Sequence, residues 1–148
     1  VNSGQLENTL INSRTAKEYN VISNNAGGGE GIRAPYMAAG ELPEADVLKK
    51  IGTGLYLGNL HYLNWSDCIG GRITGMTRYA CFWVENGEIV APIQNMRFDD
   101  SFYNFFGENL EAVSNKVEFN PEVGTYESRS LGGTHCPGVL LSSFSLTL

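Results

Sequence analysis

Two histidines and three cysteines are the side chains of this sequence best suited to metal binding or nucleophilic chemistry. A zinc peptidase usually places two histidines on one helix, with a glutamate that acts as general base on the metal-bound water. Here His61 and His135 are far apart in the chain, neither is followed by a glutamate, and both lie in sequence typical of strands or loops. The sequence therefore predicts no complete zinc site within this chain.

His135 and the adjacent Cys136 form a local pair that could bind a soft metal, or in which the cysteine could become an activated nucleophile. Neighbouring side chains of a strand point to opposite faces, which disfavours a shared metal. No third ligand or base occurs at the usual spacing. Because Gly133 precedes the pair and Pro137 follows it, the sequence favours a turn leading into the last strand, with Cys136 as a small buried residue. The two residues remain weak candidates for metal ligands.

The other reactive groups have simpler interpretations. Cys68 lies in a polar segment and could be reactive, whereas Cys81 lies between aromatic residues of an expected strand and is predicted to be structural. No Gly-x-Ser-x-Gly motif of a serine nucleophile occurs. The glycine-rich stretch Ser23–Gly31 lacks the following Gly-Lys-Ser or Gly-Lys-Thr of a phosphate-binding loop, so a solvent-exposed loop is predicted.

Composition restricts the class of protein. A chain of 148 residues with 42% apolar and 18% charged residues can form one domain with a hydrophobic core. Its net charge of −6 and lack of basic runs argue against binding to nucleic acid or to an anionic membrane. Three scattered cysteines are not a disulfide framework and indicate a reducing compartment, hence a cytoplasmic protein. The chain begins at Val1 rather than methionine, so we expect a fragment of a longer protein.

The expected fold class is α+β, predominantly antiparallel β in a barrel or sandwich, with two or three short helices in a single domain over residues 1–148. Helices are predicted at Ser13–Tyr19, at Leu42–Gly52 and from Phe102 to Gly107. Thr15 and Glu18 have the spacing of a capping box for the first. The second has acidic residues near its start and basic residues near its end, which complement the helix dipole.

Strands are predicted from alternating or continuous apolar residues at Gly4–Asn12, Gly54–Leu63, Thr77–Val84, Leu110–Val113 and Gly138–Leu148. The segments Asn64–Arg72 and Asn115–Gly133 are polar and are predicted to be irregular.

A β-hairpin is the most specific structural prediction. Asn86 and Gly87 are the preferred pair for a two-residue type I′ turn. The corresponding register places Glu85 opposite Glu88, Val84 opposite Ile89 and Trp83 opposite Val90. The apolar residues on both faces of Thr77–Val84 indicate a buried strand.

Several stretches resemble the C-terminal region of the TldD/PmbA family, which is also labelled "modulator of DNA gyrase". They are Gly54–Leu60 (GLYLGNL), Thr74–Val90 (TGMTRYACFWVENGEIV), Pro92–Asp100 (PIQNMRFDD) and the closing Cys136–Phe144 (CPGVLLSSF). The family also has a segment similar to Leu42–Gly52 just before the Gly-Leu-Tyr motif. The resemblance covers nearly the whole chain.

This resemblance implies a two-chain zinc peptidase that trims unfolded peptides, including microcin-type precursors. TldD-like subunits carry a His-Glu-x-x-x-His helix upstream of the region seen here and a cysteine ligand late in the chain. TldE/PmbA-like subunits lack these ligands and pair with the active subunit. Counting back from Pro137, the family's cysteine ligand falls near Val123, which is not a cysteine, and Cys136 lies later, beside the last strand. We therefore expect a TldE/PmbA-like chain without a cofactor of its own, and zinc in the full complex.

The expected partners are a TldD-like catalytic subunit or a second copy of the chain, and an extended peptide that adds as a strand to an exposed sheet edge. Candidate contact residues are Asn59, His61, Arg72 and Arg78, which are polar positions in or beside the matching motifs. Two alternatives remain open. The chain could belong to a catalytic TldD-like peptidase whose metal helix lies upstream, or to a non-enzymatic, gyrase-modulator-type interaction module.

Overall fold

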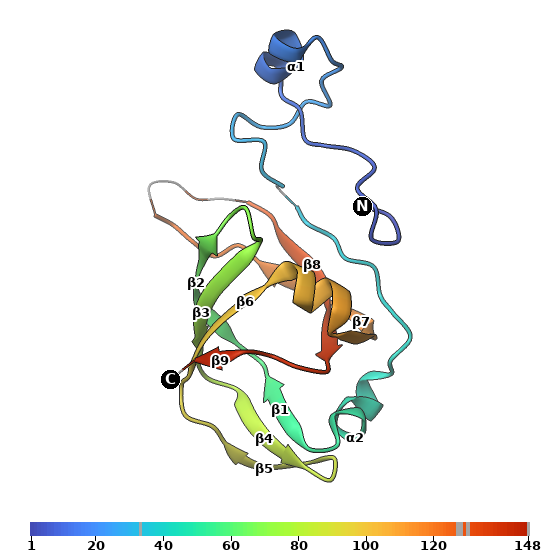
Figure 1. Ribbon diagram of the computed structural model, residues 1–148, viewed down its shortest axis with the longest axis vertical. Helices are drawn as coiled ribbons and strands as arrows, with labels where there is room; N and C mark the ends of the chain where they lie inside the picture. The colour runs from blue at the N-terminus through green and yellow to red at the C-terminus, as the bar shows by residue number, and fades with distance from the viewer. Residues whose placement is uncertain (33, 127–128, 130, 148) are drawn as a thin grey trace. The chain divides into compact units, whose positions relative to one another are not determined.

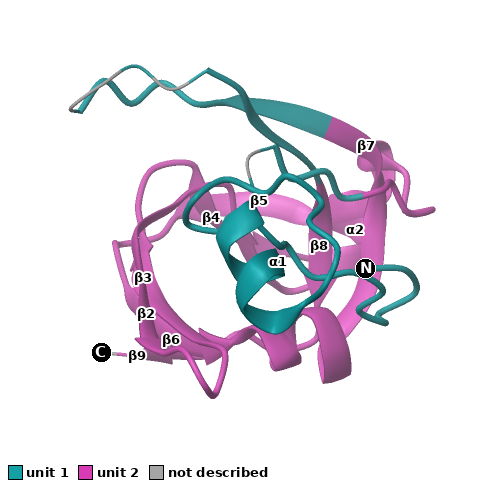
Figure 2. Cartoon of the chain, turned by 90° about the horizontal axis from the view of Figure 1, so that it is seen from above, with its two compact units in different colours: residues 1–37, 118–136 teal, residues 38–117, 137–148 magenta. Residues whose placement is uncertain are grey.

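The chain divides into two compact units, which are described separately here (Figure 2). The computed structural model describes residues 1–32, 34–126, 129 and 131–147. Unit 1 comprises Val1–Met37 and Glu118–Cys136, and unit 2 comprises Ala38–Val117 and Pro137–Leu148. No helix in the described ranges is long and apolar enough to cross a membrane.

The predicted α+β class with mostly antiparallel strands is confirmed (Figure 1). One sheet has the order β1-β4-β5, with β1 at Gly54–Leu57, β4 at Cys81–Glu85 and β5 at Glu88–Pro92. A second has the order β2-β3-β6-β9, with β2 at Leu60–Asp67, β3 at Arg72–Thr77, β6 at Arg97–Ser101 and β9 at Leu146–Thr147. The third pairs β7 (Leu110–Pro121) with β8 (Gly133–Leu141). Seen from above, the strands of unit 2 curve around one interior (Figure 2).

Short helices lie where the sequence predicts them. They are α1 (Ser13–Tyr19), the 3₁₀ turn η1 (Glu44–Asp46) leading into α2 (Val47–Ile51), and the π-helical segment η2 (Asn104–Glu108). The predicted capping box of α1 is wrong, because the Asn12 side chain accepts hydrogen bonds from the backbone N–H groups of Arg14 and Thr15. The loop Ser23–Gly31 has no helix or strand, as predicted, and Glu30 in it accepts a hydrogen bond from the Asn12 N–H.

Two predicted strands are each broken by a corner. The chain leaves β1 at Gly58, whose N–H donates to the Ala80 carbonyl at 2.9 Å. A Cβ at Gly58 would stand 2.5 Å from that oxygen, so only glycine allows this close approach. Ala80 itself has a positive φ of 56° and separates β3 from β4. The continuous strands predicted at Gly54–Leu63 and Thr77–Val84 are therefore wrong, since alternation of residue types does not reveal where two backbones cross.

The hairpin prediction is confirmed at its tip and wrong further along. Asn86 and Gly87 both have positive φ, as a type I′ turn requires. Glu85 pairs with Glu88 and Val84 with Ile89. Trp83 then pairs with Ala91 rather than Val90, because a bulge shifts the register between Trp83 and Val84.

Other boundaries also differ from the prediction. No strand occurs at Gly4–Asn12; β2 continues to Asp67 into the segment predicted to be a loop; and β7 continues to Pro121 into the segment predicted to be irregular. The strand predicted at Gly138–Leu148 is divided between β8 and β9. Leu148, at the end of that prediction, lies outside the described residues, as do residues 127, 128 and 130 of the segment predicted to be irregular.

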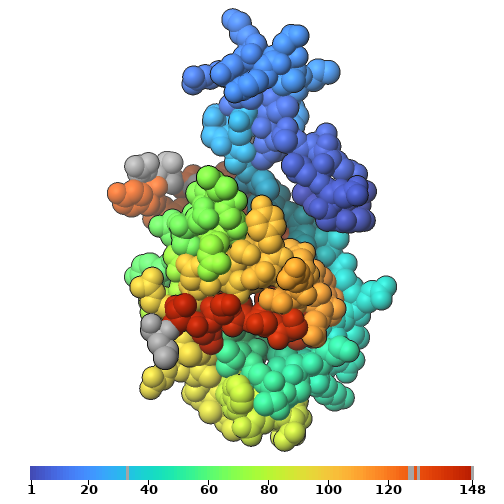
Figure 3. All heavy atoms as spheres, in the orientation of Figure 1, coloured from blue at the N-terminus to red at the C-terminus, as the bar shows by residue number. Residues whose placement is uncertain are grey.

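The core of unit 2 centres on Phe98 of β6, which is 1% exposed. Its ring packs on Phe144 at a centroid distance of 5.0 Å, and Phe144 stacks on Phe105 of η2 at 5.4 Å. Phe105 is buried and belongs to this core, whereas Phe106 of the same helix is 48% exposed. Figure 3 shows the C-terminal segment, in red, crossing this face of unit 2 between the orange segment that contains η2 and the green segment below.

A buried carboxylate joins β6 to η2 and to the segment before β9. Asp100 is 2% exposed. Its Oδ1 accepts hydrogen bonds from the Ser101 N–H at 2.8 Å and from Asn104 Nδ2 at 2.7 Å, and its Oδ2 accepts from the Ser145 N–H at 3.1 Å. Burial alone would raise the pKa of this carboxyl, but the hydrogen bonds outweigh that cost, and the net pKa is lowered.

We predict that Asp100→Asn lowers the free energy of unfolding by about 2 kcal/mol at neutral pH, since charged hydrogen bonds in a buried site are lost. The pKa of Asp100 is lower in the folded than in the unfolded protein, so its contribution is present above about pH 4 and is lost as pH falls through the folded value. Urea unfolding of both proteins at neutral and acidic pH measures this. The difference between them should shrink below about pH 4.

The neighbouring carboxylate of Asp99 provides the control for this prediction. Asp99→Asn should have the smaller effect at neutral pH, because the Asp99 side chain is 28% exposed in its ion pair. Equal losses for the two variants would contradict the role assigned to Asp100.

Candidate functional site

The candidate site lies on one face of the sheet β2-β3-β6. His61 of β2 pairs with Met76 of β3, and Met76 pairs with Arg97 of β6. Directly opposed residues in neighbouring strands project to the same face. The register therefore aligns an imidazole, a thioether and a guanidinium across three strands.

A bulge in β2 presents Tyr62 beside this row. The pairing of β2 with β3 shifts between His61 and Asn64, and Tyr62 has a positive φ of 53°, which is unfavourable for a bulky residue. The Tyr62 ring is exposed and meets the His61 ring edge to face at a centroid distance of 4.4 Å. On the other strand, a Cβ at Gly75 would stand 2.8 Å from both Leu63 Cδ2 and Phe98 Cε1. Glycine at position 75 leaves room for the Leu63 side chain against β3, and the Tyr62 ring next to it in sequence remains exposed to solvent.

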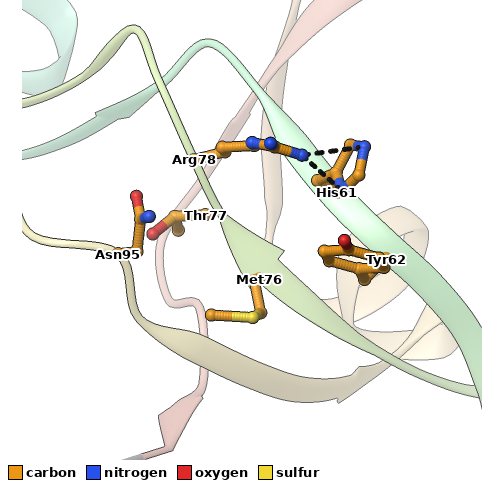
Figure 4. A pocket seen from close by; sticks show the side chains of 6 residues that line it. All are labelled: His61, Tyr62, Met76, Thr77, Arg78 and Asn95. Atoms are coloured by element: carbon orange, nitrogen blue, oxygen red, sulfur yellow. Dashed lines mark hydrogen bonds between the residues drawn. The ribbon is translucent and has the colours of Figure 1, made fainter.

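Two adjoining depressions form what we call the β2–β3 groove. The first has a volume of about 190 Å³ and is lined by His61, Tyr62, Met76, Thr77, Arg78 and Asn95 (Figure 4). The second has a volume of about 220 Å³ and is lined by Tyr62, Thr74, Gly75, Met76 and Arg97. Tyr62 and Met76 line both, so the depressions are continuous. No carboxylate occurs among these lining residues.

Two of the four residues predicted to contact a peptide or partner, His61 and Arg78, line this groove, and a third, Asn59, is hydrogen-bonded to Arg78 through its backbone. Arg78 Nη1 lies 3.1 Å from His61 Nδ1 and 3.2 Å from Nε2 (Figure 4). A guanidinium only donates, so in a hydrogen bond here the imidazole ring would be the acceptor. The Arg78 N–H donates to the Asn59 carbonyl at 3.2 Å. The Asn59 side-chain Oδ1 is buried and has no hydrogen-bond partner among the described residues.

Arg72, the fourth predicted residue, lies at the other end of β3. Its Nε donates to Asp99 Oδ1 at 2.9 Å, and its Nη2 forms an ion pair with the same oxygen. A hydrogen bond from the Ser66 side chain, followed by that from Arg72, lowers the pKa of Asp99. This cluster links β2, β3 and β6 and does not line the groove.

Arg97, Tyr62 and Asn95 line the groove but were not identified from the sequence. The signal for Arg97 is its place opposite Met76, which becomes visible only when the β3–β6 register is known. The signal for Tyr62 is the bulge, because residue type alone gives no indication of a left-handed tyrosine.

The weak metal candidates His135 and Cys136 lie in β8 of unit 1, not in the predicted turn. The His135 ring stacks on Phe119 of β7 at 4.7 Å. Cys136 Sγ accepts a hydrogen bond from Asn120 Nδ2 at 3.5 Å. Within the described part of the chain, no three His, Cys, Asp or Glu side chains gather in a way that could hold a metal. The donor set therefore does not fit a zinc site, and we derive no chemical step through a metal in this chain.

The three cysteines occur as free thiols. Cys81 is 3% exposed, which agrees with its predicted structural role. Cys68 is exposed. Cys136, predicted to be buried, is half-buried.

Comparison with known proteins now identifies the family. A family model described as "PmbA/TldA metallopeptidase C-terminal domain" matches residues 1–148. The chain belongs to this PmbA/TldD family. It is 30% identical to "Metalloprotease PmbA" of Escherichia coli O157:H7 over 118 residues, which are 80% of this chain and 25% of that relative. The chain thus spans about a quarter of the curated relative's length.

Two solved structures share the fold of this PmbA/TldD domain. A Thermotoga maritima protein described as a modulator of a DNA gyrase superposes with a TM-score of 0.72 and 22% identity, over 99% of this chain and 32% of that chain. TldE from Thermococcus kodakarensis gives a TM-score of 0.72 with 15% identity, over 94% of this chain and 31% of that chain. At these identities the likeness concerns the fold alone.

We predict that Asn59→Leu leaves the free energy of unfolding unchanged or raises it by up to about 1 kcal/mol, because replacing a buried oxygen that lacks a partner relieves its desolvation cost. Asn104→Leu is the matched control. It removes the 2.7 Å hydrogen bond to Asp100 and should lower the free energy of unfolding by about 2 kcal/mol. Denaturant titration measures both. Equal destabilisation by the two substitutions would show that Asn59 Oδ1 has a partner in the folded protein.

Proposed function

We propose that this chain is the C-terminal domain, a single domain over residues 1–148, of a TldE/PmbA-like subunit in a zinc peptidase complex. The observation that carries the proposal is the lack of a cysteine in the segment around Val123, near which the family resemblance places a cysteine ligand. The 30% identity to a protein named PmbA supports the same subtype. In this account zinc belongs to a catalytic partner, and the present chain contributes binding surface.

The surface offered to an extended peptide is the outer edge of β2. In the order β2-β3-β6-β9, β2 is an edge strand of eight residues, six of them exposed, and it contains no proline. Among the edge strands of the two larger sheets, the others are less suitable, because β1 has four residues, β9 has two and β5 ends in Pro92. In the two-stranded sheet, β8 contains Pro137 and β7 ends in Pro121. A sheet edge can accept another strand through its free backbone groups. His61 of β2 and Arg78, which contacts it, would provide side-chain contacts to the added peptide, and Asn59 would contribute through the backbone segment that leads into β2.

The cysteines and His135 bear on the proposed cellular location and on the catalytic alternative. Free cysteines, with Cys68 exposed, support a reducing cytoplasmic location. The catalytic TldD-like alternative would require His135 or Cys136 to bind metal, and their contacts with Phe119 and Asn120 do not favour it. The exposed edge strand β2 favours peptide handling over a gyrase-associated module.

Metal analysis tests the subunit assignment. We expect the desalted protein alone to contain no stoichiometric zinc, and its complex with a TldD-like partner to contain zinc that remains with the partner after the two are separated. Elemental analysis of both samples measures this.

About one zinc per chain in the protein alone would contradict the proposal. In that case Cys136→Ser and Cys68→Ser form a matched pair. Loss of zinc from Cys136→Ser, with zinc retained by Cys68→Ser, would identify the catalytic alternative.

A further inference from the structure

Two arginines of the β2–β3 groove have no carboxylate partner in the part of the chain that the structure describes. Arg78 contacts His61, and no ion pair involves Arg97. By contrast, Arg72 pairs with Asp99, Lys116 with Glu44 and Lys49 with Asp46. Several other basic residues in the described part of the chain, such as Arg14 and Lys50, form no ion pair either. What distinguishes Arg78 and Arg97 is that both line one groove that has no carboxylate among its lining residues.

Backbone contacts fix the two arginines relative to one another. Thr77, which precedes Arg78, is 1% exposed and its N–H donates to the Met96 carbonyl at 2.9 Å. Its hydroxyl oxygen accepts from the Met96 N–H at 2.8 Å. Since Arg97 follows Met96, these bonds hold the origins of both guanidinium side chains on adjacent strands. The backbone positions from which the two arginine side chains extend are thus set before any ligand binds.

The remaining lining residues complete a site for a planar anion. Tyr62 offers an exposed aromatic wall and Asn95 an amide, while Met76 forms an apolar floor shared by both depressions. Guanidinium groups match a carboxylate through paired, charge-assisted hydrogen bonds. His61 contacts Arg78 through its ring nitrogens and offers no carboxylate to neutralise the guanidinium, so the cation remains available.

We propose that the β2–β3 groove binds a carboxylate group of a peptide through Arg78 and Arg97. This inference rests on the proposed peptide-binding function and names the chemistry that the site selects. The carboxylate could be an acidic side chain or the terminal carboxylate of the peptide, and both present the same group to the two arginines.

Three short synthetic peptides of otherwise identical sequence test the proposal by isothermal titration with the protein. The first has one central glutamate and an amidated C-terminus, the second has glutamine in its place and an amidated C-terminus, and the third has glutamine and a free C-terminus. We expect the first or the third to bind about tenfold or more tightly than the second, because hydrogen bonds to charged groups contribute that much. Which of the two is favoured distinguishes a side-chain from a terminal carboxylate.

Substitutions then assign the preference to the two arginines. Arg78→Gln and Arg97→Gln should each reduce the preference for the carboxylate peptide about tenfold, whereas Arg14→Gln, an exposed arginine of unit 1, should leave it unchanged. Equal binding of all three peptides would overturn the carboxylate site while leaving the proposed peptide-binding function intact. Absence of binding by all three would overturn both. A preference that survives Arg78→Gln and Arg97→Gln in correctly folded protein, judged by an unchanged unfolding midpoint, would also overturn the site.

Discussion

The buried carboxylate of Asp100 is the interaction on which the arrangement of unit 2 depends. A carboxylate removed from water is costly unless its oxygens accept hydrogen bonds, and here three donors from β6, η2 and the segment before β9 supply them. The result is a polar junction at the end of β6, two residues after Phe98. Because Phe98 and Phe144 pack together beside it, the polar junction and the apolar core fix the same strand.

The position of β6 in turn determines the candidate site. Arg97 begins β6, and its place opposite Met76 exists only while β6 is registered against β3. The Arg72–Asp99 ion pair secures the same register at the far end of β3. The groove is therefore formed by regular strands with one local departure, the bulge at Tyr62. Placing binding groups on strands rather than on loops favours a site that is organised in advance of its ligand.

The sequence predicts those features of the fold that depend on neighbouring residues. The turn at Asn86–Gly87, the helix ending at Gly52 and the structural role of Cys81 all follow from local pattern and chemistry. The corner where Gly58 meets Ala80 does not, because it depends on the approach of two segments that are distant in the chain. The candidate site was likewise predicted only in part. Asn59, His61 and Arg78 were predicted because they lie in or beside the matching motifs, whereas Arg97 could be found only from the register of β6 against β3.

Within a family of metallopeptidases, this account gives the chain the task of holding a peptide at the edge strand β2 and assigns the metal to a partner. Hydrogen–deuterium exchange of the protein with and without an extended peptide tests that claim most directly. The account predicts slower exchange of backbone amides in Leu60–Asp67 on peptide binding, and no change in the exposed edge strand Glu88–Pro92 of the other sheet of unit 2. Unchanged exchange in Leu60–Asp67 at saturating peptide would contradict it.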